Sequence, residues 1–225
     1  ARVALSRNVA APDATRIDLR QVPAAWVEAL VHAAWAAARL TGGTLEGEVR
    51  IATTADRPMR VDADLAIDGL GLETADGSIA AGDVGADLAI RVTLPDDGIH
   101  ARVDGDLQGG ELLSGNAYVA LPATPVAIGL DAGRVGDGGW SLSRLEWRDG
   151  QALRVDGQAR LTPALDIGAL TLTLASDDAA ALPGRYLSGW LGPAGLPGLS
   201  LAGGFRAAIA LDDARLRSAD VALHR

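Results

Sequence analysis

The sequence predicts a mainly β protein, with one long twisted antiparallel sheet curled into an open apolar groove, one helix and one shorter helix. Three observations lead to this prediction. Long stretches alternate between apolar and polar residues, which is the period of a strand with one buried face. Turn-forming residues separate these stretches at short intervals. Apolar residues make up 48% of the chain but aromatic residues only 4%, so aliphatic side chains must build the core.

The clearest element is a hairpin over Val84–Leu107. Alternate residues from Val84 to Leu94 are apolar, and the alternation resumes at Ile99 after the turn-forming residues 95–98. Two alternating runs joined by a Pro/Asp/Gly loop are typical of a β-hairpin.

The pattern also predicts the register of this hairpin. The expected pairs are Leu94 with Ile99, Val92 with Ala101, Ile90 with Val103, and Leu88 with Gly105. Each apolar residue then meets an apolar or small one, as a sheet with one buried face requires. The same register places Arg91 opposite Arg102, an unfavourable pair that we expect Asp87 and Asp104 to offset.

The first part of the chain predicts two short strands and then a helix. The strands are expected at Val3–Ser6 and Arg16–Leu19, and the helix at Ala24–Leu40. Pro23 suits the first turn of a helix, and Gly42-Gly43 would stop it. We expect this helix to pack on a face of the sheet or to plug one end of it.

Strands dominate the rest of the chain, with one helical interruption at about 177–192. The stretch 111–130 is less regular, and Pro122 and Pro125 confine it to edge or bulged strand. In the interruption, Asp177 and Asp178 could cap a turn, and Tyr186 and Trp190 lie four residues apart, as on one helix face. The other strands are expected at Thr44–Ile51, Met59–Asp68, Leu70–Glu73, Leu142–Trp147, Gln151–Leu161, Ala169–Ala175, Leu199–Leu201, Phe205–Leu211 and Leu216–Leu223.

Composition and motifs argue against catalysis and against nucleic acid. The net charge is −9 and the pI is near 4.7, whereas phosphate neutralisation needs a basic surface. The chain has no Cys, and all 20 of its Lys and Arg residues are Arg, so thiolate nucleophiles and catalytic lysines are excluded. Glu28 and His32 have the spacing of a helical metal pair but lack further ligands nearby. The sequence therefore predicts no enzyme activity, no metal site and no cofactor.

The remaining candidate site is the apolar face itself. It must be buried, either because the sheet closes into a sandwich or barrel, or because acyl chains occupy a trough. Small inward residues such as Ala86, Ala101 and Gly105 leave room beside the backbone and favour the trough. The expected lining residues are Val61, Leu65, Ile67, Leu88, Ile90, Val92, Ile99, Val103, Leu107, Leu153 and Val155.

The chain resembles the AsmA-like superfamily, the repeating β-groove envelope proteins that include the TamB, YhdP and YdbH families. The resemblance lies in the helix-then-strand module Val22–Ile51 with its loose L-x-G-x-x-x-G core at Leu40–Gly47, and in the alternating strands. A helix, a glycine pair and a strand recur about 160 residues later, from Leu182. The irregular stretch 111–130 and the tryptophans depart from a plain groove. Residues Trp140, Trp147 and Trp190 could gate one end or belong to the core.

The resemblance implies a non-catalytic role in phospholipid transport between the inner and outer membranes of a Gram-negative envelope. It implies phospholipid acyl chains as ligands and a periplasmic location, with an inner-membrane anchor outside this chain. Residues 1–225 would then form a single β-groove segment of a longer protein, with other envelope proteins as further partners. The alternatives are a structural or protein-binding β-sandwich module of the envelope and a closed, lipocalin-like binder of a small apolar ligand.

Overall fold

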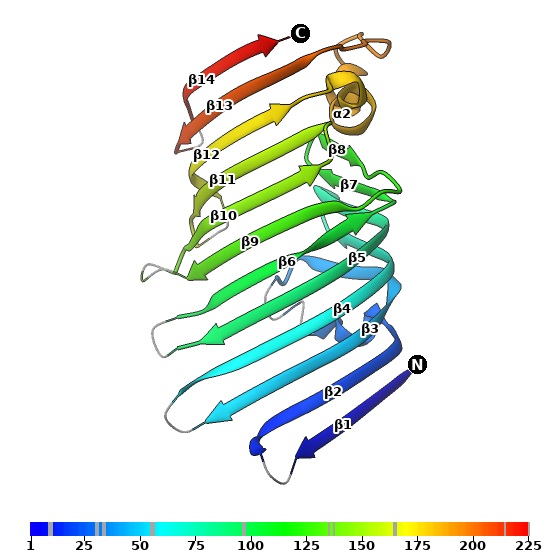
Figure 1. Cartoon of the computed structure of the whole chain (residues 1–225), viewed down its shortest axis with the longest axis vertical. Coiled ribbons are helices and arrows are strands. Elements are labelled where there is room, and N and C mark those ends of the chain that lie inside the picture. The colour runs from blue at the N-terminus through cyan, green and yellow to red at the C-terminus, as the bar shows by residue number, and fades with distance from the viewer. Residues whose placement is uncertain are drawn as a thin grey trace.

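One open antiparallel sheet organises the whole molecule. In the computed structural model, twelve strands lie side by side in the order β1-β2-β3-β4-β5-β6-β9-β10-β11-β12-β13-β14 (Figure 1). Among the described residues, β1 pairs with β2 alone and β14 with β13 alone, so the sheet does not close. The structure describes residues 1–8, 11–29, 32, 35–54, 57–95, 98–134, 136, 138–163, 166–213 and 215–224. The predicted open, mainly β architecture is confirmed, and a closed sandwich does not form.

The four strands β2 to β5 are the longest, with 13–18 residues each, and the other strands of the row have 7–10. The first six are β1 (Arg2–Asn8), β2 (Ala11–Pro23), β3 (Ala38–Thr54), β4 (Arg57–Thr74), β5 (Ile79–Leu94) and β6 (His100–Gln108). The later ones are β9 (Val126–Arg134), β10 (Trp140–Asp149), β11 (Leu153–Leu161), β12 (Ile167–Ser176), β13 (Gly204–Asp212) and β14 (Arg215–His224). A short hairpin, β7 (Glu111–Ser114) with β8 (Ala117–Ala120), branches from β5.

The register predicted for the β5–β6 hairpin is confirmed. Val92 pairs with Ala101, Ile90 with Val103, and Leu88 with Gly105. Ile99 precedes β6 and lies outside the ladder. The hydrophobic pattern sets this register because a one-residue shift would turn every apolar side chain to the other face.

The predicted Arg91–Arg102 pair also forms, but its compensation differs in part from the prediction. The Arg102 Nε donates to Asp104 at 2.7 Å, as expected. The nearest carboxylate to Arg91 belongs to Asp62 on β4, at 3.9 Å, whereas Asp87 faces Asp106. The prediction missed Asp62 because it considered one hairpin, and a central strand has neighbours on both sides.

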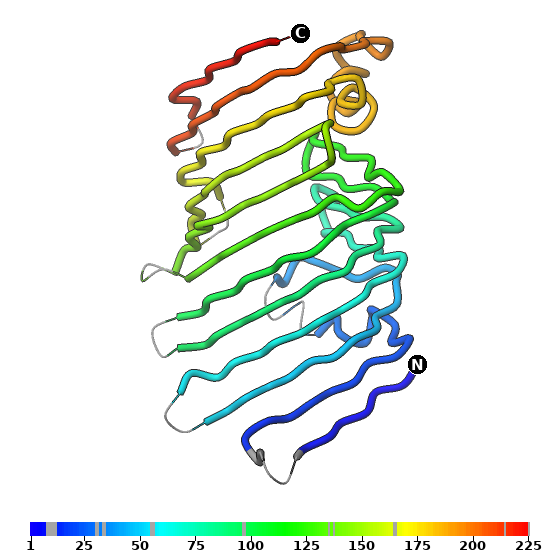
Figure 2. The backbone as a smooth tube through the Cα atoms, viewed as in Figure 1, coloured from blue at the N-terminus to red at the C-terminus, as the bar shows by residue number. Residues whose placement is uncertain are grey.

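A line of bulges bends the long strands near one of their ends. The register shifts between Leu19 and Val22, between Gly42 and Thr44, and between Ile67 and Leu70. Left-handed backbone recurs at the same level in four neighbouring strands. The residues are Gln21 (φ 51°), Gly43 (φ 109°), Gly69 (φ 62°) and Asp83 (φ 57°). Beyond this line, the ends of β3, β4 and β5 turn away from the rest of the sheet (Figure 2).

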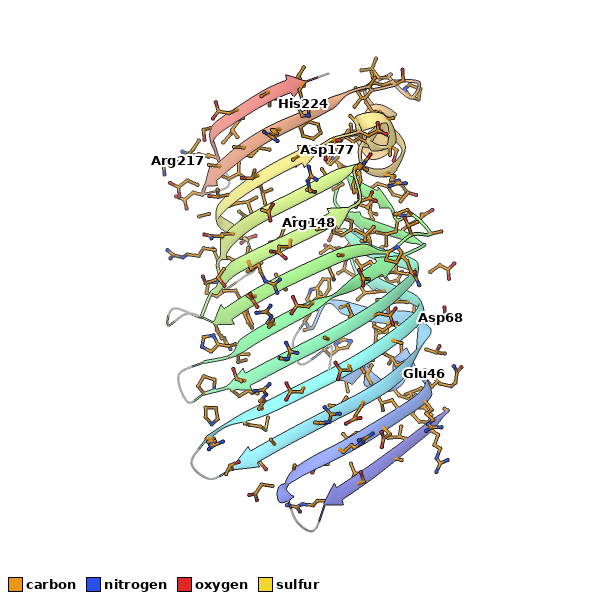
Figure 3. All side chains as sticks on the ribbon, viewed as in Figure 1. Glu46, Asp68, Arg148, Asp177, Arg217 and His224 are labelled. Carbon is orange, nitrogen blue, oxygen red and sulfur yellow. The ribbon has the colours of Figure 1, made fainter. Side chains whose placement is uncertain are left out.

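The connections at this bent end cover part of the apolar face, and we call them the wall. The wall consists of the turn η1 (Ala24–Val27), the β7–β8 hairpin, and a helical segment of η2 (Ala179–Ala181), η3 (Pro183–Leu187) and α2 (Ser188–Leu191). All these segments lie on one side of the sheet, together with the β4–β5 and β10–β11 turns. The ends where β3 meets β4, β5 meets β6, β9 meets β10 and β13 meets β14 lie opposite, on what we call the hairpin side (Figure 1). In Figure 3, Glu46, Asp68 and Asp177 mark the wall side, and Arg217 marks the hairpin side.

Three apolar clusters join the wall to the sheet. One gathers Val22 and Leu45 with Ala24 of η1, and another gathers Val84 and Val126 with Leu121. The third packs Val155 against the helical segment. Leu70 contacts the first two clusters and Trp147 the last two, so the core runs continuously along the wall.

The helix predicted at Ala24–Leu40 is wrong at its end. Residues 24–27 form a 3₁₀ turn, Glu28, Ala29 and His32 are helical, and four positions of the predicted helix, 30, 31, 33 and 34, lie outside the described residues. Ala38–Leu40 already belongs to β3, where it pairs with Leu72–Thr74. The glycine pair that suggested a helix stop instead supplies the bend, because Gly43 takes a φ that other residues rarely adopt.

Three other predictions are adjusted by the structure. Leu70–Glu73 is the end of β4 and not a separate strand. Residues 199–201 form no strand, because Leu201 is held by side-chain packing on the third cluster and not by a ladder. The irregular stretch 111–130 becomes the short β7–β8 branch and then β9, and both prolines lie between β8 and β9. The predicted helical interruption is present, and the Asp178 side chain accepts a hydrogen bond from the Ala180 N–H.

Candidate functional site

Three uninterrupted rows of apolar or small residues cross the inner face, which is the face that the wall partly covers. In each row, every residue is the cross-strand partner of the next. The middle row is Leu5, Ile17, Val49, Ala63, Ile90, Val103, Leu130, Leu145, Gly157, Leu172, Ile209 and Ala219. It therefore runs through all twelve strands of the sheet.

The two flanking rows have the same character. The row next to the wall is Val3, Leu19, Gly47, Leu65, Leu88, Gly105, Ile128, Trp147, Val155, Leu174, Ala207 and Val221. The open row, next to the hairpins, is Thr15, Ile51, Val61, Val92, Ala101, Ala132, Leu142, Ala159, Leu170, Leu211 and Leu216. At the usual strand spacing, twelve strands give a track about 50 Å long.

The wall covers only part of this face. Leu19, Trp147, Val155 and Leu174 of the wall row contact the clusters beneath the wall. In the open row no described residue belongs to these clusters, and in the middle row only Leu145 and Leu172 do. Ile51, Ile90 and Val92 are accordingly half-buried. The inner face is thus an apolar trough with one wall.

The sequence-predicted lining residues fall into two groups. Val61, Leu65, Leu88, Ile90, Val92 and Val103 lie in the three rows and are half-buried outside the clusters. Ile67, Leu107, Leu153 and Val155 pack against the clusters beneath the wall, so they support the trough and do not line its open part. Ile99 precedes β6, beside the hairpin turn.

Sequence reasoning missed the part of the track on β9, β10, β12 and β13. Ile128, Leu130, Leu142, Leu170 and Ile209 continue the rows there. The same two-residue alternation that located the hairpin was available for β12 and β13. On β9 the signal was weaker because two prolines precede the strand, and a bulge between Leu142 and Leu145 breaks the period on β10.

The outer face carries ladders of opposite charges instead. Arg144 bridges three carboxylates, with contacts of 2.6 Å to Asp104, 2.7 Å to Asp131 and 3.1 Å to Glu146. Hydrogen bonds from Arg102 and Arg144 lower the pKa of Asp104. A solvated, charged face of this kind is not suited to stacking against a second sheet.

Because of these ladders, we expect the stability of the folded protein to vary with pH in the acid range. A hydrogen bond from Arg60 lowers the pKa of Asp62, as those from Arg102 and Arg144 lower that of Asp104. A carboxylate with a lowered pKa in the folded state contributes stability above its unfolded pKa and loses it as the pH falls through the folded value. We therefore expect a flat melting temperature from neutral pH to about 5 and a decline below about 4, the ordinary pKa of Asp. Thermal unfolding followed by circular dichroism at a series of pH values from 7 down to about 3 measures this change in melting temperature.

An Arg144→Gln variant provides the control for this prediction. It should be less stable at neutral pH and should lose less stability on acidification, because part of the charge coupling is already gone. An acid dependence as steep as that of the parent protein would contradict the assignment of this effect to the outer ladders.

The chain matches no protein-family model, no curated protein sequence and no solved structure. The site must therefore be interpreted from its own geometry.

The described residues offer neither a metal centre nor a membrane-crossing helix. They contain no group of three or more His, Asp or Glu side chains placed to hold a metal ion. Glu28 and His32 lie 3.7 Å apart as an exposed pair. None of the described helices has the length and apolar character needed to cross a membrane.

Proposed function

We propose that this protein binds the acyl chains of phospholipids along its inner face. The observation that carries the proposal is the set of apolar rows, two of which cross all twelve strands and the third of which crosses eleven, while the wall leaves the open row and most of the middle row outside its clusters. An exposed apolar surface of this extent is typical of a binding surface and not of an ordinary monomer surface.

The shape of the track favours chain-like ligands over compact ones. The track has no enclosed end, and its length of about 50 Å exceeds the ~30 Å hydrocarbon core of a bilayer. Each buried methylene contributes about 0.8 kcal/mol, and this contribution is similar at every position along continuous aliphatic rows. A chain can therefore shift along the rows without losing contact, which gives a low-barrier route for movement.

On the basis of the AsmA-like resemblance, we extend the proposal to the cellular role. The chain would be a segment of a periplasmic envelope protein, tethered to the inner membrane by a part outside this chain. It would contribute passively to phospholipid transport between the inner and outer membranes, without enzyme activity or a cofactor. The protein-binding alternative uses the same inner face for a partner protein and predicts no affinity for free acyl chains.

Titration with a fluorescent long-chain fatty acid tests the proposal on two adjacent residues of β12. Leu170 lies in the open row between Ala159 and Leu211, whereas Thr171 is exposed on the outer face. Leu170→Asp should weaken binding by roughly tenfold or more, because a carboxylate on the track must be desolvated or avoided. Thr171→Asp, the matched control, should bind as the parent protein does. Equal affinities for the two variants, or no binding by the parent protein, would count against the proposal.

A further inference from the structure

A depression on the outer face collects positive charge, although the protein as a whole is acidic. It has a volume of about 540 Å³, within the usual range for ligand sites, and it spans β4, β5, β6, β9 and β10. Its lining includes Arg60, Arg91, His100, Arg102, Asp131 and Arg134. Four arginines and one aspartate thus line the depression, and Asp62 and Asp104 pair with three of these arginines from beside it, in a chain whose net charge is −9.

The cross-strand register brings these groups together. Arg91 pairs directly with Arg102, and Thr93 pairs with His100, which in turn pairs with Gly133. Gly133 leaves space in the depression beside His100, because a Cβ at this position would come within 2.9 Å of the His100 Nδ1. The hollow therefore follows from the sequence order along the strands and from one missing side chain.

Two of the four guanidinium groups are weakly engaged by carboxylates. The Arg91 Nε lies 3.9 Å from Asp62, which already accepts two hydrogen bonds from Arg60. Arg134 is the last residue of β9, two residues after Ala132 of the open row, and it lines the end of the depression without an ion pair to any carboxylate of the described residues. Arg102, by contrast, donates to Asp104 at 2.7 Å. The depression thus keeps donors available to an external ligand.

The placement of Arg91 opposite Arg102 costs stability, since like charges directly across a ladder repel. An anion above the pair would relieve this repulsion. Guanidinium groups match the geometry of phosphate oxygens through paired N–H donors. We propose that this depression binds a phosphate group.

Two sources share this chemistry. The phosphate could belong to the headgroup of a phospholipid whose tails lie on the inner face, or to a free phosphate. The site does not depend on lipid binding, because none of its charged groups lies in the three apolar rows.

Calorimetric titration with two probes, inorganic phosphate and dihexanoyl phosphatidylglycerol below its micelle concentration, tests the proposal. In the double variant Arg91→Gln/Arg134→Gln, both probes should bind roughly tenfold more weakly or worse, because two charged donors are lost. The exposed outer-face Arg206 lies on β13, away from the depression. Arg206→Gln removes the same charge and should bind both probes within about twofold of the parent protein. The double variant should fold normally, since it removes a repulsive pair.

Ile90→Asp on the inner face distinguishes the two sources. If this variant weakens only phosphatidylglycerol binding, the phosphate site serves a lipid headgroup. If it weakens neither probe while the double variant weakens both, the phosphate site stands and recognises the phosphate without the acyl chains. If the parent protein binds neither probe, or the double variant binds both as tightly as the parent protein, the phosphate site is refuted.

Discussion

Ile90→Asp is expected to weaken the binding of long acyl chains strongly while leaving the protein folded. Ile90 occupies the centre of the middle row, between Ala63 and Val103, and is half-buried. A carboxylate there must stay hydrated, so a bound chain loses contact over about three methylenes. At ~0.8 kcal/mol each, this loss weakens binding roughly 50-fold.

The fold should survive this substitution because Ile90 lies outside the three clusters that join the wall to the sheet. Fatty-acid titration measures the loss of binding, and cooperative urea unfolding measures the retained fold. If Ile90→Asp unfolded the protein, Ile90 would have to be a fully packed core residue, and the trough interpretation would be wrong.

Asp149→Ala is expected to destabilise the protein by about 2–3 kcal/mol, mainly by loosening the wall. Asp149 is 4% exposed and accepts hydrogen bonds from the Arg185 Nη1 at 2.7–2.8 Å and from the Tyr186 hydroxyl at 2.8 Å. The Trp147 Nε1 donates to the same hydroxyl at 2.9 Å. Burial, together with the bond to Asp149, raises the pKa of Tyr186.

This network attaches η3 of the wall to the end of β10. Without the carboxylate, both Arg185 and Tyr186 lose their acceptor in a partly dry environment. The loss of stability in Asp149→Ala stays below that expected on breaking a fully buried ion pair, because the Arg185 side chain is 33% exposed. Urea unfolding gives the free energy, and the near-ultraviolet circular dichroism, to which Trp147 and Tyr186 contribute with the other aromatic residues, reports the loosening.

Asp156→Ala is the matched control for this prediction. Asp156 also pairs with an arginine, Arg148, but its side chain is 57% exposed. An exposed pair of this kind contributes less than about 1 kcal/mol. If the two alanine variants lost the same stability, the Asp149 network would have no special part in holding the wall.

Local patterns predicted most of the strands and one register correctly because alternation directly encodes a strand with one buried face. The Ile90–Val103 and Leu88–Gly105 pairs followed from that rule alone. The Asp178 cap also followed from local chemistry.

The wall could not be predicted in the same way because it depends on contacts between distant segments. β7 pairs with the start of β5, about 30 residues earlier, and β8 packs against η3, more than 60 residues later. The bend combines Gln21, Gly43, Gly69 and Asp83 from four strands, and no single segment shows that they align. The basic depression was missed for the same reason, since its arginines come from four separate strands.

The tryptophans also needed tertiary context. Trp147 joins two of the apolar clusters, whereas Trp190 is 47% exposed on the wall. Spacing along the sequence could not separate these two environments.

The most direct test of the central claim is native mass spectrometry of the gently purified protein, followed by extraction and analysis of any bound lipid. The acyl-chain proposal predicts mass adducts that match phospholipids and that disappear from Ile90→Asp but persist in Thr171→Asp. A lipid-free mass for the parent protein, with no uptake of phospholipid when it is added, would contradict the proposal that the inner face binds acyl chains.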